Sequence, residues 1–211
     1  IGVGLVGSEM CIRDRDDPLR GFSFKNNGPI DMRMNTESDA NLKKWINNAS
    51  ENEIEDVIRQ FGEESNAKKI SKKIIEVRQN KSINDTHDLA EIIKSVSRFK
   101  KNKSHPATKT FQAFRIFINN ELDEIQKLLS SIDDMMKVGS RLVFISFHSL
   151  EDRLIKNFFR PKEISYPRDI PINNEIEIRY KALGKKIRAS KDEIKINPRS
   201  RSAILRAFEK I

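Results

Sequence analysis

Apolar residues recur at helical spacing through the middle of the chain, between about residues 38 and 97. Four segments place isoleucine, leucine, valine or phenylalanine three or four residues apart, with polar residues between them. Their apolar faces are Leu42, Trp45 and Ile46; Ile54, Val57, Ile58 and Phe61; Ala67, Ile70, Ile74 and Val77; and Leu89, Ile92, Ile93 and Val96. The pattern predicts four short helices in a compact bundle that acts as an interaction or recognition module.

Polar residues that favour helix starts precede three of these segments. Ser50 and Glu53 have the spacing of a capping box. Ser38 or Asp39 can cap the first helix, and Thr86 can cap the last. We therefore expect helices to begin close to these positions.

The pattern changes after residue 105. Residues 106–129 predict one long helix, and residues 142–147 are six mostly β-branched or aromatic residues. Such a run is typical of a strand buried on both faces in a parallel sheet. A further helix is expected over residues 149–159, and strands over residues 175–180 and 203–208. We predict an α/β fold that contains the second half of a doubly wound sheet, with the first half missing from this chain.

Composition excludes several classes of protein. No apolar run approaches the roughly 20 residues that a membrane span needs. One cysteine in 211 residues excludes a disulfide scaffold and a cysteine-rich zinc site, and it fits a reducing compartment. No basic-then-apolar signal segment opens the chain. We expect a cytoplasmic location.

Positive charge is concentrated in two stretches. The chain carries 40 basic and 31 acidic residues, a net charge of +9, and the stretch Lys181–Ile211 is strongly basic. Residues 98–103 form a second basic run. Two such stretches are the footprint of a nucleic-acid groove. The alternative is two solvated, lysine-rich faces.

The first fifteen residues have no period that continues into the rest of the chain. The letters GLVGSEMCIRDR, from Gly4 to Arg15, resemble a translated sequencing adaptor. We therefore expect residues 1–15 to be non-native, Cys11 included, and the natural protein to extend further upstream. The alternative is a short apolar strand from Gly2 to Val6.

Two loops carry candidate chemistry. The first contains RGFSF and GPIDMRM, from Arg20 to Met34, with two glycines, two phenylalanines and an Asp-x-Arg pair. It is either a functional loop or an ordinary turn in which Asp31 and Arg33 pair locally. The second, His105–Thr110, places hydroxyls and a lysine at a helix N-terminus, where phosphate binds readily, although threonines there also serve as simple caps.

A third cluster, Ser146–Arg153, follows the predicted strand 142–147. Ligands of open α/β sheets bind at the carboxyl ends of strands, so a dense group of serine, histidine and acidic residues indicates a functional site. The absence of a G-x-S-x-G elbow argues against a serine hydrolase. Three well-separated histidines argue against a zinc site.

Four long motifs, RGFSF…GPIDMRMN, HPATKTFQAFRIFIN, GSRLVFISFHSLEDRLIKNFFR and NPRSRSAILRAFEK, resemble those of the MraW family of ribosomal RNA small subunit methyltransferases. The resemblance covers residues 16–211. It implies transfer of a methyl group from S-adenosylmethionine to N4 of a cytidine in the decoding region of bacterial 16S rRNA. The small ribosomal subunit is then the partner, and neither DNA nor a membrane is expected.

The resemblance also implies a domain organisation. Residues 16–38 would be a loop of a Rossmann-like class I methyltransferase domain, 39–104 an inserted helical substrate-recognition domain, and 105–211 the remainder of the methyltransferase domain. The donor-binding motifs of the family would lie upstream of Asp16, so no cofactor-binding residue is assigned. We expect this fragment alone to be inactive. The alternative function is a non-catalytic RNA-binding module.

The implied reaction gives the clusters their expected roles. His148 and Asp152 are candidates as orienters of the base or proton acceptors, with Ser146 and Glu151 in support. The candidate substrate pocket consists of Asp31, Arg33, Phe22 and Phe24. The candidate RNA contacts are Arg20, Lys103, His105, Lys109, Arg199 and Arg201. For the last two, the alternative is surface charge beside the last strand.

Overall fold

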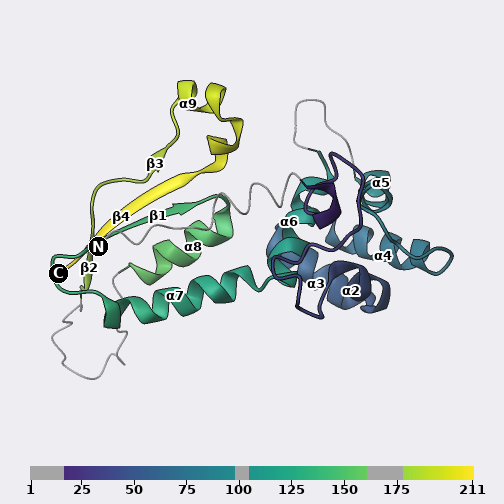
Figure 1. The fold of residues 1–211 in the computed structure, drawn as a ribbon, viewed down its shortest axis with the longest axis horizontal. Helices are drawn as coiled ribbons and strands as arrows, with labels where there is room; N and C mark the ends of the chain where they lie inside the picture. Colours follow the sequence, from purple (N-terminus) through teal and green to yellow (C-terminus); the bar gives the residue numbers. More distant parts are fainter. Residues whose placement is uncertain (1–16, 98–104, 161–177) are drawn as a thin grey trace, which may run out of the picture. The chain divides into compact units, whose positions relative to one another are not determined.

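The computed structural model describes residues 17–97, 105–160 and 178–211 (Figure 1). The chain divides into two compact units, Ile1–Glu121 and Leu122–Ile211. Each unit has its own hydrophobic core. The expectations for residues 1–15 lie outside the described residues.

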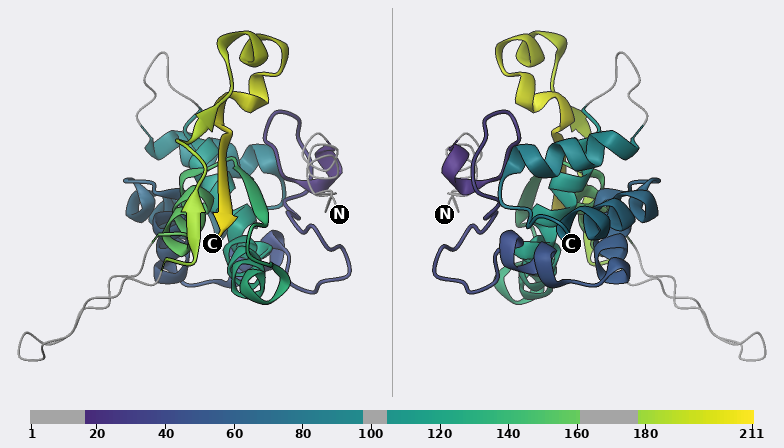
Figure 2. Two further views of the ribbon diagram at one scale, coloured as in Figure 1. Left: turned by 90° about the vertical axis from the view of Figure 1, so that its left-hand side faces the viewer. Right: turned by 90° about the vertical axis from the view of Figure 1, so that its right-hand side faces the viewer.

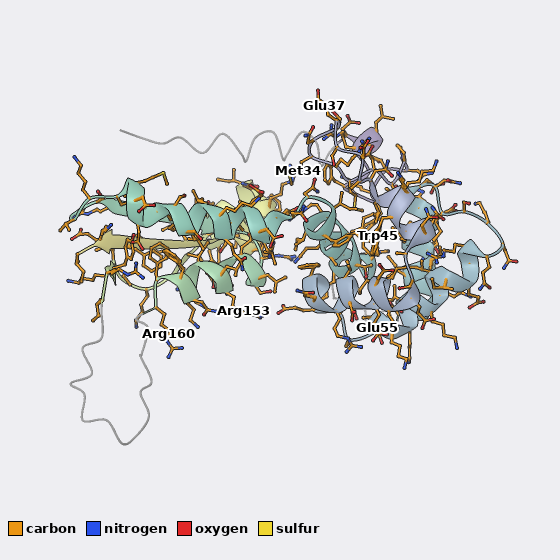
Figure 3. The ribbon with its side chains drawn as sticks, turned by 90° about the horizontal axis from the view of Figure 1, so that it is seen from below. Met34, Glu37, Trp45, Glu55, Arg153 and Arg160 are labelled. Carbon is orange, nitrogen blue, oxygen red and sulfur yellow. The ribbon has the colours of Figure 1, made fainter. Side chains whose placement is uncertain are left out.

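Unit 1 is helical. Its elements are η1 (Pro18–Arg20), α2 (Leu42–Asn48), α3 (Glu51–Gly62), α4 (Ala67–Arg78), α5 (Thr86–Val96) and α6 (Ala107–Ile118). The four helices expected between residues 38 and 97 are confirmed as α2–α5, and their apolar faces meet in one core with Phe114 of α6. Trp45 of α2 lies over α6, with its ring 4.7 Å from that of Phe117 (Figure 3). The helical period therefore located this core correctly.

The caps of the helices differ in part from the expected ones. The capping box of Ser50 and Glu53 is present. Asn41, not Ser38 or Asp39, caps α2, and Asp85 caps α5. Thr86 instead ties the loop before α2 to α5, because its hydroxyl accepts from Gly28 N–H at 3.2 Å.

The single helix expected over residues 106–129 is wrong, because the chain breaks after α6. A second helix, α7 (Glu121–Met135), begins after Asn119 and Asn120. Asn120 has a left-handed backbone with φ of 49°, which asparagine tolerates better than most residues. Asn119 uses its amide for contacts with a distant loop. Apolar periodicity continues across the break and therefore hides it.

Unit 2 is a small sheet with helices. Its elements after α7 are β1 (Arg141–Ser146), α8 (Ser149–Phe158), β2 (Tyr180–Ala182), β3 (Ile187–Arg188), α9 (Lys191–Ile196), η2 (Pro198–Ser202) and β4 (Ile204–Lys210). The strand order is β1-β4-β2, and β3 also pairs with β4 (Figures 1 and 2). The expected helix after β1 and the expected last strand are both present. Of the strand expected over 175–180, the first three residues lie outside the described part, and β2 begins at Tyr180.

Two expectations for β1 are wrong. Every described strand pair is antiparallel, and β1 is buried on one face only. Leu142 and Phe144 pack on the core formed with α7 and α8, whereas Val143 and Ile145 are 54% and 55% exposed. A continuous apolar run specifies neither the direction of its neighbour nor whether both faces are covered.

Candidate functional site

The turn between β1 and α8 is fixed by a reciprocal cap. His148 is the N-cap of α8, and its Nδ1 accepts from Glu151 N–H at 3.4 Å. The Glu151 carboxylate reaches back and accepts from Phe147 N–H at 2.7 Å and from His148 N–H at 3.4 Å. The turn from Phe147 to Glu151, directly after the end of β1, is therefore held in one geometry.

The second ring nitrogen of His148 is the unusual atom of this turn. Because Nδ1 accepts a hydrogen bond, the proton of the neutral ring is placed on Nε2. Nε2 is buried and lies 3.2 Å from Glu151 Oε1, but it has no hydrogen bond of acceptable geometry with a described residue. A buried donor in this state can orient a polar group that is presented to it.

Asp152 and Arg206 form a two-pronged ion pair. Arg206 Nε donates to Asp152 Oδ1 at 2.7 Å, and Nη2 donates to Oδ2 at 2.9 Å. These hydrogen bonds hold the pKa of Asp152 below its usual value. A carboxylate so paired is a weak proton acceptor, and the geometry favours the orienting role for Asp152. Sequence reasoning missed Arg206, although a charge inside the apolar strand ILRAF is a signal for it.

Ser146 has a simpler place. Its side chain is buried at the end of β1, and its hydroxyl donates to Ile204 O at 3.4 Å. The bond closes the last pair of the β1–β4 ladder. Ser146, His148, Glu151 and Asp152 are thus brought together, as a consequence of their closeness in sequence.

In unit 1, Asp31 and Arg33 pair with each other. Arg33 Nε lies 2.6 Å from Asp31 Oδ1, and Nη2 lies 2.8 Å from Oδ2. The Arg33 hydrogen bond is the main cause that lowers the pKa of Asp31. Arg33 also donates to the carbonyl of Ser38. Local pairing, one of the two sequence alternatives, is what the structure contains, and a role in substrate binding stays a prediction.

Arg20 and Asn119 hold the same loop from two sides. Arg20 Nη2 donates to the carbonyls of Arg33 and Met34 at 2.6 and 3.0 Å, and its guanidinium lies 5.8 Å from the Phe22 ring centre. Asn119 Nδ2 donates to Met32 O at 2.8 Å, and its Oδ1 accepts from Met34 N–H at 2.6 Å. Sequence reasoning missed Asn119, whose only signal is the Asn-Asn pair.

The remaining candidates of unit 1 gather at the start of α6. The rings of Phe24 and His105 lie 4.6 Å apart, and Phe24 also meets Phe111 at 4.9 Å. Lys109 Nζ donates to Glu63 O at 2.9 Å. These contacts attach the loop and α3 to α6. Lys103 lies outside the described residues.

Arg199 and Arg201 lie on η2 of unit 2, and both are exposed. The amide of Arg199 donates to the side chain of Asn197 at 3.2 Å, which caps η2. The expected RNA contacts of both side chains stay predictions.

Comparison with known proteins gives a consistent result. The sequence model of the MraW methylase family matches residues 10–211. Ribosomal RNA small subunit methyltransferase H of Coxiella burnetii (strain Dugway 5J108-111) is 47% identical over 198 residues, which are 93% of this chain and 64% of that protein. The proteins of the same name from Alcanivorax borkumensis and Chromohalobacter salexigens are 43% and 42% identical, with 93% of this chain and 64% and 60% of those proteins covered.

The chain therefore spans about 60–64% of the length of these relatives. Among the described residues, no helix is both long and apolar enough to cross a membrane. The mixed α/β architecture, with its helical bundle and small sheet, agrees with a partial class I methyltransferase fold, as predicted. With a match over residues 10–211 and relatives at 42–47% identity, the chain belongs to the MraW methylase family.

Proposed function

We propose that this chain is part of an enzyme that transfers a methyl group from S-adenosylmethionine to N4 of a cytidine in the 16S rRNA of the small ribosomal subunit. The observation that carries the proposal is the 47% identity to a relative named ribosomal RNA small subunit methyltransferase H. The enzyme would act in the cytoplasm on ribosomal particles or their RNA.

The reaction requires that the cytosine that accepts the methyl group be held in a defined orientation. The N4 lone pair of cytosine is delocalised into the ring, so the amine must be oriented and its proton accepted as the methyl group arrives. His148 supports the orienting part of this role because its buried Nε2 lacks a hydrogen bond with a described residue. As a donor, Nε2–H suits the ring nitrogen or carbonyl of cytosine and would orient the base. The proton that N4 loses after it takes up the methyl group would pass to water, because the methylated, cationic amine is a strong acid.

Its neighbours would position His148. Glu151 holds the backbone of the turn, Ser146 closes the strand below it, and Asp152 attaches α8 to β4 through Arg206. On the substrate side, we propose Asp31, Arg33, Phe22 and Phe24 as pocket residues. Phe22 beside the Arg20 guanidinium offers the ring and cation that an unstacked base binds.

The described residues do not fit the methyl donor. Nucleotide-like cofactors of such folds rest on a glycine-rich turn between a strand and a helix. The described turn of that kind, between β1 and α8, consists of Phe147 and His148 and contains no glycine. We therefore assign no described residue to the donor and derive no step from it. This observation also favours the second candidate function for the chain by itself, a non-catalytic RNA-binding module.

A chimaera tests the proposal. This chain would replace the matching residues of the Coxiella burnetii relative, and single-turnover transfer from labelled S-adenosylmethionine to undermethylated small-subunit particles would be measured. Nuclease digestion and mass spectrometry of the nucleosides identify the product. We expect N4-methylcytidine from the chimaera, and neither transfer nor saturable donor binding from the 211-residue chain alone.

The relative itself is the positive control. An inactive chimaera that folds and binds donor, beside an active relative, would contradict the proposed function of this chain. Methylation at another atom would contradict the N4 assignment. Micromolar donor binding by the chain alone would contradict the expectation that its donor-binding residues lie outside this chain.

A further inference from the structure

Residues 183–202 form a lobe that is attached to the sheet of unit 2 where β3 pairs with β4, and its helical part extends beyond the sheet (Figures 1 and 2). The lobe contains β3, α9 and η2, and it is strongly basic: seven lysines and arginines accompany two acidic residues. The basic side chains, all on exposed residues, are Lys185, Lys186, Arg188, Lys191, Lys195, Arg199 and Arg201.

Local hydrogen bonds rather than a core define the lobe. None of its residues belongs to the hydrophobic core of unit 2, and Ile196 is 87% exposed. Ser190 caps α9 by accepting from Glu193 N–H at 3.1 Å, and the Ser200 hydroxyl donates to Asn197 O at 2.8 Å. The lobe is therefore an ordered surface feature that contributes little apolar burial to folding.

The basic residues of this C-terminal region divide into two kinds. Outside the lobe, Arg206 pairs with Asp152, and Lys210 donates to the carbonyls of Asp133 and Met136 at 2.7 and 3.0 Å. Those cations stabilise the fold. Within the lobe, five side chains make no hydrogen bond or ion pair with a described residue: Lys185, Lys186, Arg188, Lys191 and Arg201.

The lobe also lies near the turn that carries His148. Arg188 of the lobe faces Ile204 in the β3–β4 ladder, and Ile204 in turn faces Ser146, the last residue of β1, and accepts a hydrogen bond from its hydroxyl. The charge of Lys186 also lowers the pKa of Asp152, after the hydrogen bonds and charge of Arg206. Asp152 is in the first turn of α8, which begins after His148. A polyanion held by the lobe would therefore lie beside the candidate site.

Resting on the proposed function, we propose that residues 183–202 are a docking surface for RNA phosphates, which holds the substrate strand beside the β1–α8 turn. When unpaired, exposed cations neutralise RNA phosphates, the counterions condensed on the RNA are released, and this release drives binding. The lobe contains no aromatic residue or histidine, so it has no ring on which a base can stack. Its binding is therefore independent of base sequence.

Two double variants of the 211-residue chain test the inference. Lys185→Gln with Lys186→Gln removes two lobe charges, and Lys127→Gln with Lys137→Gln removes two charges from the same unit. Binding of a fluorescent mixed-sequence RNA oligonucleotide would be measured by anisotropy across a salt series, without donor. We expect the lobe variant to bind more weakly and to lower the salt slope by about one per lysine, with a smaller change in the control variant.

Three further measurements decide between outcomes. Lys185→Arg with Lys186→Arg is expected to restore binding, and poly(U) of equal length is expected to bind like the mixed sequence. Equal losses in the lobe and control variants would overturn the inference. So would lobe-dependent binding to anionic phospholipid vesicles but not to RNA, which would indicate a membrane surface.

The same substitutions in the chimaera separate this inference from the proposed function. If the lobe variant binds RNA as well as the unchanged chimaera and still transfers the methyl group, the docking role of the lobe is refuted and the proposed reaction is not. Lobe-dependent RNA binding by a chimaera that folds and binds donor but never methylates refutes the proposed reaction alone.

Discussion

Arg206 and Asp152, 54 residues apart in sequence, are joined by two parallel hydrogen bonds of 2.7 and 2.9 Å. Phe144 of β1 faces Arg206 across the ladder, so the guanidinium lies on the side of the sheet that α8 covers. Both side chains are mostly buried, with 20% and 15% exposure. The pair thus fixes the first turn of α8 to the middle of β4.

Replacing Arg206 should loosen unit 2. Arg206→Ala leaves a partly buried carboxylate without its partner, which typically costs about 1–3 kcal/mol. Hydrogen–deuterium exchange of the β4 and α8 amides measures the loss within this unit. Asp152→Asn completes a double-mutant cycle, and additive effects of the two changes would show that the pair contributes no coupling energy.

The same pair predicts an acid dependence of stability. Because the pKa of Asp152 is lowered in the folded chain, its contribution is present above the unfolded value of about 4. That contribution is lost as the pH falls through the lower, folded value. Arg206→Ala should flatten this part of the acid unfolding curve, and an unchanged curve would contradict the assignment.

His148 offers a way to separate capping from chemistry. His148→Ala removes both the cap of α8 and the ring, whereas His148→Asn keeps a side-chain acceptor at the N-cap. We expect the alanine variant to lose about 1 kcal/mol of helix stability, and the asparagine variant to lose much less. In the chimaera, both should slow methyl transfer by about 10²-fold, because neither side chain places a donor where Nε2–H would orient the base.

Donor affinity is the control for these variants and should not change. Wild-type turnover in His148→Asn would show that His148 serves only as the cap of α8 and has no role in methyl transfer.

Tyr180 should ionise late. Burial, and then its hydrogen bond of 2.5 Å to Asp133, raise the pKa of Tyr180 to about 12. Stability from the neutral phenol is therefore fully present below the unfolded pKa of about 10 and is lost as the pH rises towards 12.

The tyrosinate absorbance of the wild type and of Tyr180→Phe measures this shift. The chain has two tyrosines, so the difference between the two titrations reports Tyr180. We expect this difference to be centred near 12. A difference centred near 10, the ordinary pKa of tyrosine, would contradict the buried hydrogen bond.

Asn119 should control the order of the loop before α2. Asn119→Ala removes a donor to Met32 O and an acceptor for Met34 N–H, and we expect a loss of about 1–3 kcal/mol in unit 1. Met32 adds to the effect because it holds a left-handed backbone, with φ of 61°. Faster amide exchange at Met34 is the specific signature, and Asn48→Ala, on an exposed face of α2, is the control.

The helices of unit 1 could be predicted because two local signals coincide there. Apolar residues keep a period near 3.6, and Ser50 with Glu53 marks a start in the sequence itself. The start of α5 was misplaced by only one residue, since both Asp85 and Thr86 are good caps. Local chemistry therefore specified this bundle almost completely.

The candidate site was predictable only in part. The group from Ser146 to Asp152 was found because it is contiguous in sequence. Arg206 and Asn119 were not found, since each acts on residues at least 54 positions away. The sequence also could not show that the lobe cations are unpaired whereas Arg206 and Lys210 pair within the fold. A lysine that pairs and one that faces water look the same in a sequence. The expected domain limits, 39–104 and 105–211, stay a prediction.

Because β1 is buried on one face only, neighbouring positions along it should differ in their tolerance of polar substitutions. Leu142 and Phe144 are packed against helices, so every polar substitution there should impair folding of the chain. Val143 and Ile145 face solvent beside Ala207 and Leu205, so threonine or lysine there should be tolerated or even improve solubility. In a saturation scan of this strand, scored by soluble yield, we expect tolerance of polar residues to alternate from one position to the next.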